Sequence, residues 1–168
     1  MDRNADASSR WLDQSEIRTQ QALGPLVLVG AYVIDDWRLV ALQGGFLLLT
    51  ALHDALGPYA LLYRWVLRPL GLVAPDLRVD NPEPHRFAAA FGFSVLAVAA
   101  FLLAKGHATA GWMLALTVAI LGGIAFFGWC AGCFTYYVLH RLGARGFFGR
   151  APIGAAFPGI RPPRSGGR

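Results

Sequence analysis

The sequence predicts an all-α integral membrane protein: four transmembrane helices arranged as two antiparallel hairpins, with an interfacial amphipathic helix between the hairpins. Of the 168 residues, 55% are hydrophobic and only 15% are charged, whereas soluble domains carry about 25% charged residues. The apolar residues also form long runs without charge, which is typical of helices that cross a bilayer. The length of the chain allows one domain.

The first hairpin is predicted from two apolar segments separated by a pair of aspartates. A polar N-terminal tail over residues 1–15 precedes the first span, at about 17–34, and the second span covers about 37–55. Asp35 and Asp36 interrupt the apolar pattern, and two carboxylates in mid-membrane would be costly. We therefore expect a tight turn at the aspartates.

The connection between the hairpins contains the predicted interfacial helix, at about residues 58–68. Arg64 and Arg68 lie one turn apart on this helix, among apolar and aromatic residues. A helix of this composition is suited to lie in the plane of the membrane interface. Arg64, Arg68 and Arg86 are candidate contacts for lipid headgroups or other anions, or they simply anchor the chain and set its topology.

The second hairpin combines a span without charge, at about 87–104, with a longer apolar run at about 109–139. A helix rises about 1.5 Å per residue, so the second of these exceeds the bilayer core. We expect it to tilt or to extend along the interface. Residues 143–168 are rich in Gly, Pro and Arg, and they are predicted to form a disordered tail.

Lysine and arginine residues predict the orientation. The N-terminal part, the connection between the hairpins and the C-terminal tail hold three, four and six of them, whereas the two short turns hold only Arg38 and Lys105. Cytoplasmic loops carry the excess of positive charge, so both termini are expected in the cytoplasm. The arginines flank apolar spans, which favours membrane lipids over nucleic acid as the partner of the net charge of +5.

The two cysteines of the chain, Cys130 and Cys133, form a CxxC motif within the last apolar run. On one continuous helix the two thiols share a face, and their Cα atoms are about 5–6 Å apart, within reach of a disulfide. A thiolate is the reactive form of such a pair. Late in a helix, however, the dipole does not favour a thiolate, so activation requires a break at Gly128 or Gly132.

Three interpretations of the cysteine pair remain open. The side chains can pack as two small apolar groups, or they can form a redox-active or sulfur-accepting dithiol, in which Cys133 is expected to be the more accessible thiol. They can also belong to a metal site with His140, although two thiolates do not complete a tetrahedral zinc site. No cofactor is expected, and His85 and His107 are expected to be loop residues without a role.

Gly128 and Gly132 form a small-xxx-small pair, which permits close approach of two helix backbones. The partner helix is either another span of the same chain or a second copy in a homo-oligomer. This pattern also suits a protein that docks into a larger complex.

Several motifs together resemble one known family. They are Tyr63-Arg64, Leu67-Arg68-Pro69, Pro84, Arg86-Phe87-Ala88 and the segment from Gly128 to Cys133. These residues resemble the bacterial membrane family catalogued as domain of unknown function 4395, over about residues 18–141. The resemblance implies a multi-pass protein of the bacterial inner (plasma) membrane, without an established activity. Its loose association with thioredoxin-like and sulfurtransferase proteins implies thiol or sulfur chemistry.

The sequence thus leaves three functional hypotheses. The first is a thiol-redox or sulfur-relay component in which Cys130 and Cys133 react with a cytoplasmic thioredoxin-like or sulfurtransferase partner. The second is a non-catalytic membrane subunit or scaffold. The third is a small-solute channel or transporter, for which the last three spans lack the intramembrane charge typical of proton-coupled pumps. Whether the protein is an enzyme stays open, because the CxxC pair is the one catalytic motif found.

Overall fold

The computed structural model describes residues 10–143 and 159–162, most of which are helical. The elements, in chain order, are β1 (Arg10–Asp13), α1 (Gln14–Val33), α2 (Trp37–Leu52), α3 (Pro58–Leu62), β2 (Leu77–Asp80), α4 (Pro82–Ala104), α5 (Ala108–Phe126) and α6 (Ala131–Arg141). The prediction of a mostly helical protein is confirmed.

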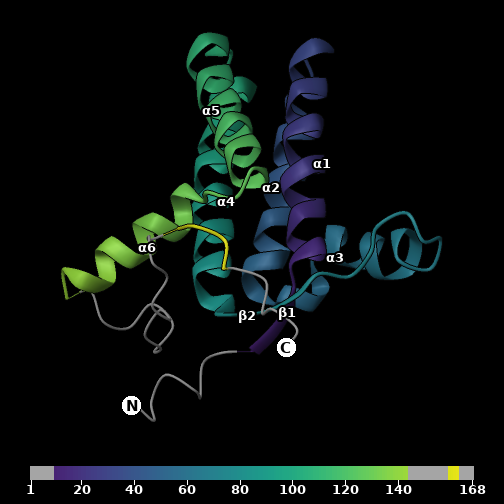
Figure 1. Cartoon of the computed structure of the whole chain (residues 1–168). Coiled ribbons are helices and arrows are strands. Elements are labelled where there is room, and N and C mark those ends of the chain that lie inside the picture. The colour runs from purple at the N-terminus through teal and green to yellow at the C-terminus, as the bar shows by residue number, and fades with distance from the viewer. Residues whose placement is uncertain (1–9, 144–158, 163–168) are drawn as a thin grey trace, which may run out of the picture.

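The four long helices α1, α2, α4 and α5 form an antiparallel bundle (Figure 1). Helix α4 packs against both α2 and α5, and α1 packs against the same two helices. The core of the bundle contains the buried side chains Leu28, Ala31, Val40, Leu47, Leu96, Ala99, Ala115 and Ala119. The alanines allow the helix backbones to approach closely.

Two helices of the bundle, α4 and α5, are long and apolar enough to cross a membrane. Helix α2 is apolar but has only 16 residues, and α1 has 20 residues but carries Glu16 and Arg18 in its first turns. Helices α4 and α5 therefore suggest membrane association, whereas the four spans stay a prediction.

The prediction of one continuous helix over residues 109–139 is wrong. Helix α5 ends at Phe126 and α6 begins at Ala131, and between them Gly128 has a φ of +113°. Side chains rarely tolerate this backbone conformation, which glycine adopts readily. Figure 1 shows that α6 leaves the bundle at a steep angle to α5. Hydropathy alone did not reveal the break because residues on both sides of it are apolar.

A short antiparallel sheet holds the start of α1 beside the start of α4. Strands β1 and β2 pair with Asp13 opposite Leu77. The predicted polar tail over 1–15 therefore contains a strand and the first residues of α1, whereas residues 1–9 lie outside the described part of the chain. Asp13 is the N-cap of α1, where it accepts a hydrogen bond from the backbone N–H of Ser15.

Helix α4 begins at Pro82, five residues before the span predicted at 87–104. Asn81 is its N-cap and accepts a 3.0 Å hydrogen bond from the backbone N–H of Glu83. Prolines at 82 and 84 fit the first helical turn, because the backbone N–H that proline lacks has no partner there. This early start places His85 on a helix rather than in a loop.

The predicted interfacial helix at 58–68 is divided into α3 and a π-helical segment, Tyr63–Leu67. Tyr59 and Tyr63 are buried. The hydroxyl of Tyr59 donates to Gln43 of α2, and that of Tyr63 donates to Asp13 at 2.6 Å. These tyrosines attach the connection to the bundle.

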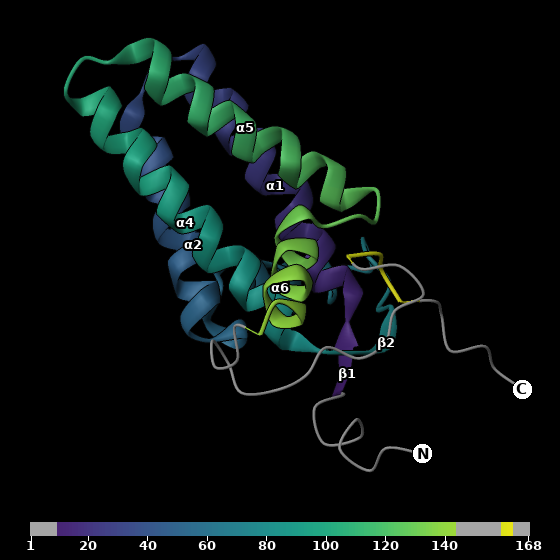
Figure 2. The same ribbon diagram turned by 90° about the vertical axis from the view of Figure 1, so that its left-hand side faces the viewer.

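Most of the predicted disordered tail, 143–168, lies outside the described residues. Residues 159–162 are described, and we call them the C-terminal strap. An antiparallel bridge pairs Ile160 of the strap with Trp129 in the break between α5 and α6. Figure 2 shows the strap, in yellow, beside the end of α5. The strap therefore lies next to the cysteine pair.

Candidate functional site

The break after α5 places both cysteines at the N-terminus of α6, not late in a helix as predicted. Cys130 is the N-cap residue, and its Sγ atom accepts a hydrogen bond from the backbone N–H of Cys133 at 3.3 Å. A helix N-terminus carries a partial positive charge, which favours the thiolate over the thiol. The location therefore supplies the activation that the predicted continuous helix lacked.

The two thiols differ in access. Both cysteines are free, and Cys133 is buried whereas Cys130 is half-buried. The prediction that Cys133 is the more accessible thiol is wrong, because its position on α6 faces α4. Cys130 lies in the connection between α5 and α6 and is the more accessible of the two thiols.

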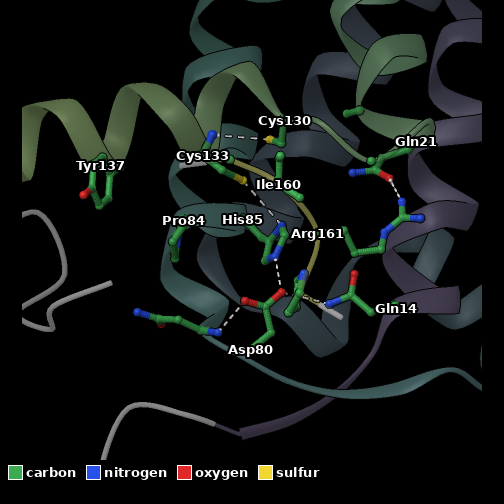
Figure 3. A pocket seen from close by; sticks show the side chains of 15 residues that line it. Gln14, Gln21, Asp80, Pro84, His85, Cys130, Cys133, Tyr137, Ile160 and Arg161 are labelled. Atoms are coloured by element: carbon green, nitrogen blue, oxygen red, sulfur yellow. Dashed lines mark hydrogen bonds and ion pairs between the residues drawn. The ribbon is translucent and has the colours of Figure 1, made fainter. Parts of the chain in front are cut away.

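Cys133 faces a histidine from the first turn of α4. Its Sγ atom lies 3.6 Å from Nδ1 of His85, and Nε2 of His85 lies 3.0 Å from Oδ2 of Asp80 (Figure 3). An ionised carboxylate only accepts hydrogen bonds, so Nε2 carries the proton, and Nδ1 of the neutral ring is an acceptor that faces the Cys133 sulfur. Asp80, His85 and Cys133 thus form a hydrogen-bonded series.

Sequence reasoning assigned no role to His85. The signal that indicates its position is the Asn81-Pro82 pair, since an N-cap asparagine followed by proline marks a helix start. With α4 starting there, residue 85 falls in the first turn beside the end of β2. Its contact with Cys133 depends on how α6 packs on α4, which the sequence pattern does not show.

The pKa values of the two thiols move in opposite directions. A hydrogen bond from the Cys133 side chain is the largest effect on Cys130; it outweighs burial and lowers the pKa of Cys130 to about 6. The same hydrogen bond, together with burial and the negative charge of Cys130, raises the pKa of Cys133. Near neutral pH the pair therefore has a thiolate at Cys130 and a proton at Cys133.

Asp80 is held ionised behind the histidine. Burial raises the pKa of Asp80, but hydrogen bonds from His85, Asn81 and Gln14 lower it, and the pKa is lowered overall. The carboxylate accepts from the side-chain amide of Gln14 at 2.8 Å and from the backbone N–H of Asn81 at 2.8 Å. An ionised Asp80 orients the His85 ring toward Cys133.

A cavity of about 70 Å³ lies beside the pair. Its lining combines β2, the starts of α1 and α4, the break between α5 and α6, and the strap. The residues that line it include Gln14, Gln21, Asp80, His85, Cys130, Cys133, Ile160 and Arg161 (Figure 3). A cavity that holds benzene measures about 150 Å³, so this space suits a few water molecules or a very small solute.

The two predicted packing glycines have different roles. A Cβ atom on Gly132 would lie 2.5 Å from Cβ of Ala88, so this glycine allows α6 to contact α4 of the same chain. A Cβ atom on Gly128 would have nothing within 4 Å. Gly128 therefore makes no such helix contact within the chain, and its positive φ forms the turn instead; its packing against a second copy stays a prediction.

The predicted anion-binding arginines lie away from the cysteine cavity. Arg64 forms an ion pair with Glu16 of α1 at 2.9 Å. Arg86 donates to the carbonyl oxygens of Ala51 and Leu52 at 2.9 and 2.8 Å, at the C-terminus of α2. Arg68 follows the π-helical segment. Contact of these arginines with lipids stays a prediction.

The alternative metal site is not assembled in the described part of the chain. No group of three or more His, Cys, Asp or Glu side chains there is arranged to hold a metal ion. His140, the predicted third ligand beside Cys130 and Cys133, lies at the far end of α6 with its ring next to that of Tyr136. Seven residues of α6, about two helical turns, separate it from Cys133.

The comparison with protein families is decided by one match: the model of domain of unknown function 4395 (DUF4395) matches residues 12–141. The chain belongs to this family. The DUF4395 match extends from β1 to the last residue of α6 and contains Asp80, His85 and both cysteines, whereas the strap lies beyond it. Comparisons with curated proteins and with solved structures give no match.

Proposed function

We propose that this DUF4395 protein is a thiol–disulfide exchange component in which Cys130 and Cys133 are the reacting pair. The observation that carries the proposal is the position of Cys130 as N-cap of α6, with the proton donor Cys133 one turn behind it. A thiolate is the attacking species in exchange with a disulfide. Two cysteines that only fill space would need neither the helix N-terminus nor a histidine.

The reaction has two steps. The Cys130 thiolate attacks one sulfur of a partner disulfide, forming a mixed disulfide while the other partner sulfur leaves as a thiolate. The Cys133 thiol then gives its proton to Nδ1 of His85 and attacks Cys130. The Cys130–Cys133 disulfide forms, and the second partner sulfur leaves as a thiolate. His85 returns the proton to a leaving thiolate, so the partner gains two electrons and the pair loses two.

His85 is suited to be the base of the second step. Cys133 is buried and its pKa is raised, so it cannot supply a thiolate by itself near neutral pH. The 3.6 Å contact to Nδ1 gives its proton a direct acceptor, and ionised Asp80 stabilises the imidazolium that results. Formation of the Cys130–Cys133 bond can therefore proceed at neutral pH.

The setting we propose for this chemistry is the bacterial inner membrane. Four spans, α1, α2, α4 and α5, would expose apolar side chains to lipid, among them Val98, Phe101, Met113 and Ile120, which are at least half exposed. The excess of lysine and arginine in the tails and in the connection between the hairpins would keep that end cytoplasmic. The dithiol lies at this end, where a thioredoxin-like or sulfurtransferase protein is the expected partner.

Equilibration with glutathione tests the proposal. Purified protein in detergent is incubated with reduced and oxidised glutathione at varied ratios, acid-quenched and analysed for the Cys130–Cys133 disulfide by mass spectrometry. We expect one reversible two-electron transition. A Ser94→Ala control, which removes an exposed hydroxyl on α4, should give the same midpoint. A pair that stays reduced at every ratio would favour a non-catalytic membrane subunit instead.

A further inference from the structure

The C-terminal strap is bound to the break between α5 and α6 by backbone pairing. The N–H of Cys130 donates to the carbonyl oxygen of Gly159, and the N–H of Arg161 donates to the carbonyl oxygen of Gly128, each at 2.9 Å. These bonds enclose the bridge between Trp129 and Ile160. The nucleophilic cysteine thus belongs to a short strand edge that already holds an extended peptide.

The space left with the strap in place is too small for a protein disulfide. The cavity of about 70 Å³ has four strap residues, 159–162, in its lining. A partner disulfide brings two sulfur atoms and at least one stretch of backbone to Cys130. The strap must therefore leave before such a substrate reaches the thiolate, and its departure exposes the unpaired backbone groups of Gly128 and Cys130.

The surroundings of Arg161 indicate the charge that the vacated edge prefers. Burial lowers the pKa of Arg161, and repulsion from the charges of Arg18 and Arg78 lowers it further, against the opposing charge of Asp76. Arg78 is paired with Asp76 at 2.7 Å, whereas the buried Nε of Arg18 has no hydrogen-bond partner in the described structure. An acidic side chain in the place of Arg161 would remove this repulsion and could accept from Arg18.

We propose that the edge Gly128–Cys130 is the docking site for an extended segment of the partner polypeptide, a segment that carries the reacting disulfide and an acidic residue. This inference rests on the proposed exchange function. The segment pairs with the edge in the manner of an added β-strand, and the strap occupies its place in the resting protein. The register follows the Trp129–Ile160 bridge. A glycine keeps the place of Gly159, where a Cβ atom would lie 2.8 Å from the carbonyl oxygen of Cys130. The partner cysteine takes the place of Ile160, which lines the cavity together with Cys130, and the acidic residue takes the place of Arg161.

The test uses a peptide probe built on this register. The probe is acetyl-Ala-Gly-Cys-Asp-Ala-amide, whose Gly, Cys and Asp take the places of Gly159, Ile160 and Arg161. Its thiol is in a mixed disulfide with thionitrobenzoate, whose release gives colour when Cys130 attacks. One control peptide is N-methylated at Asp, which removes the donor to Gly128. A second control peptide has Lys in place of Asp. A third compound, N-acetylcysteine amide in the same mixed disulfide, measures the reactivity of Cys130 toward a disulfide that cannot pair as a strand.

Two glycine variants of the full-length protein test the role of the strap, one that loosens it and one control. A Cβ atom on Gly159 would lie 2.8 Å from the carbonyl oxygen of Cys130, so Gly159→Ala should loosen the strap. Gly106, in the turn between α4 and α5, has nearly the same φ (+84° against +83°) but nothing within 4 Å of its Cβ position. Gly106→Ala is therefore the matched control for backbone strain alone.

We expect the Asp peptide to react with wild-type protein at least tenfold faster than the N-methylated peptide and faster than the Lys peptide. The concentration of Asp peptide that gives half the maximal reaction rate should fall at least fivefold in the Gly159→Ala variant. It should not change in the Gly106→Ala variant. Equal rates for the N–H and N-methyl peptides, or a half-saturating concentration that Gly159→Ala leaves unchanged, would overturn the docking site alone. Absence of any reaction of Cys130 with the N-acetylcysteine amide disulfide would overturn the exchange function as well.

Discussion

At the scale of single residues, the chemistry depends on one proton shared by Cys130, Cys133 and His85. Cys133 donates toward the Cys130 sulfur, which lowers the pKa of Cys130 to about 6, and it also lies within reach of His85 Nδ1. A proton placed on Cys133 activates the first attack, and its transfer to His85 activates the second. The same three side chains thus serve both steps.

The first prediction concerns the pH dependence of alkylation. A lowered pKa means that the Cys130 thiolate persists as pH falls, until the pH passes through about 6. The rate of Cys130 modification by iodoacetamide, followed by mass spectrometry, should therefore rise with a midpoint near pH 6. Cys133→Ala removes the hydrogen-bond donor and should move the midpoint up by at least one pH unit, whereas Ser94→Ala should not. A wild-type midpoint near 8.5, the ordinary thiol value, would contradict the assignment.

The second prediction concerns the base. His85→Asn should slow conversion of the mixed disulfide to the Cys130–Cys133 disulfide by about 100-fold at pH 7, a typical contribution of general base catalysis. The defect should shrink as pH rises, because Cys133 then ionises without help. Rapid acid quench and mass spectrometry measure this step, with His107→Asn as the control at the turn before α5. A slowing that is constant across pH would indicate a purely structural histidine.

Residue identity indicated the reacting pair but not its neighbours. The spacing of Cys130 and Cys133 is evident from the sequence. The sequence also indicated that activation requires a break in the helix at Gly128 or Gly132, and the break lies at Gly128. His85 could not be found in this way, because it is 48 residues from Cys133. Their contact results from tertiary packing, which leaves no local pattern.

At the scale of elements, the packing of α6 on α4 decides whether the site exists. Gly132 lies against Ala88, and this contact brings the N-terminus of α6 to the first turns of α4. Without it, Cys133 and His85 would separate. The position of α6 therefore links helix packing to thiol chemistry.

The third prediction tests this packing. Gly132→Ala would place its Cβ 2.5 Å from that of Ala88, and overpacking of this kind costs about 1–3 kcal/mol of unfolding free energy. Gly123→Ala in α5, with nothing within 4 Å, should be neutral or slightly stabilising because alanine favours helix. Denaturant unfolding in detergent measures both. Equal stability of the two variants would show that α6 can shift without cost.

Element boundaries were predicted best where polar or proline residues mark them. The turn at Asp35 and Asp36 was expected and lies between α1 and α2, and Asp36 caps α2. The α5–α6 break has only Gly128 as its signal, since the flanking residues are apolar like those of the helices. The strap could not be predicted either, because its pairing with Trp129 depends on a strand edge that the break creates.

At the scale of the whole molecule, the bundle presents the dithiol at one end and the turn between α4 and α5 at the other. Of the two helices long and apolar enough to cross a membrane, α4 ends at this turn and α5 begins there. Composition predicted the helical class because lipid demands long apolar helices. It did not decide the number of spans, since α2 is short and α1 begins with charged residues.

The fourth prediction concerns orientation. In a background with Cys130→Ser and Cys133→Ser, Leu72→Cys and Lys105→Cys each place one thiol at an exposed position. A membrane-impermeant maleimide should label residue 72 from the cytoplasmic side only and residue 105 from the opposite side only. Labelling of both positions from the same side would contradict the two-hairpin topology.

Trapping of a mixed disulfide tests the central claim, that Cys130 is the attacking thiol of an exchange pair. Cys133→Ala protein is incubated with glutathione disulfide at pH 7, and Cys130→Ala protein is treated in parallel. The account predicts one stable glutathione adduct on Cys130 in the first variant and at least tenfold slower adduct formation in the second. Preferential modification of Cys133, or equally slow reaction of both variants, would contradict it.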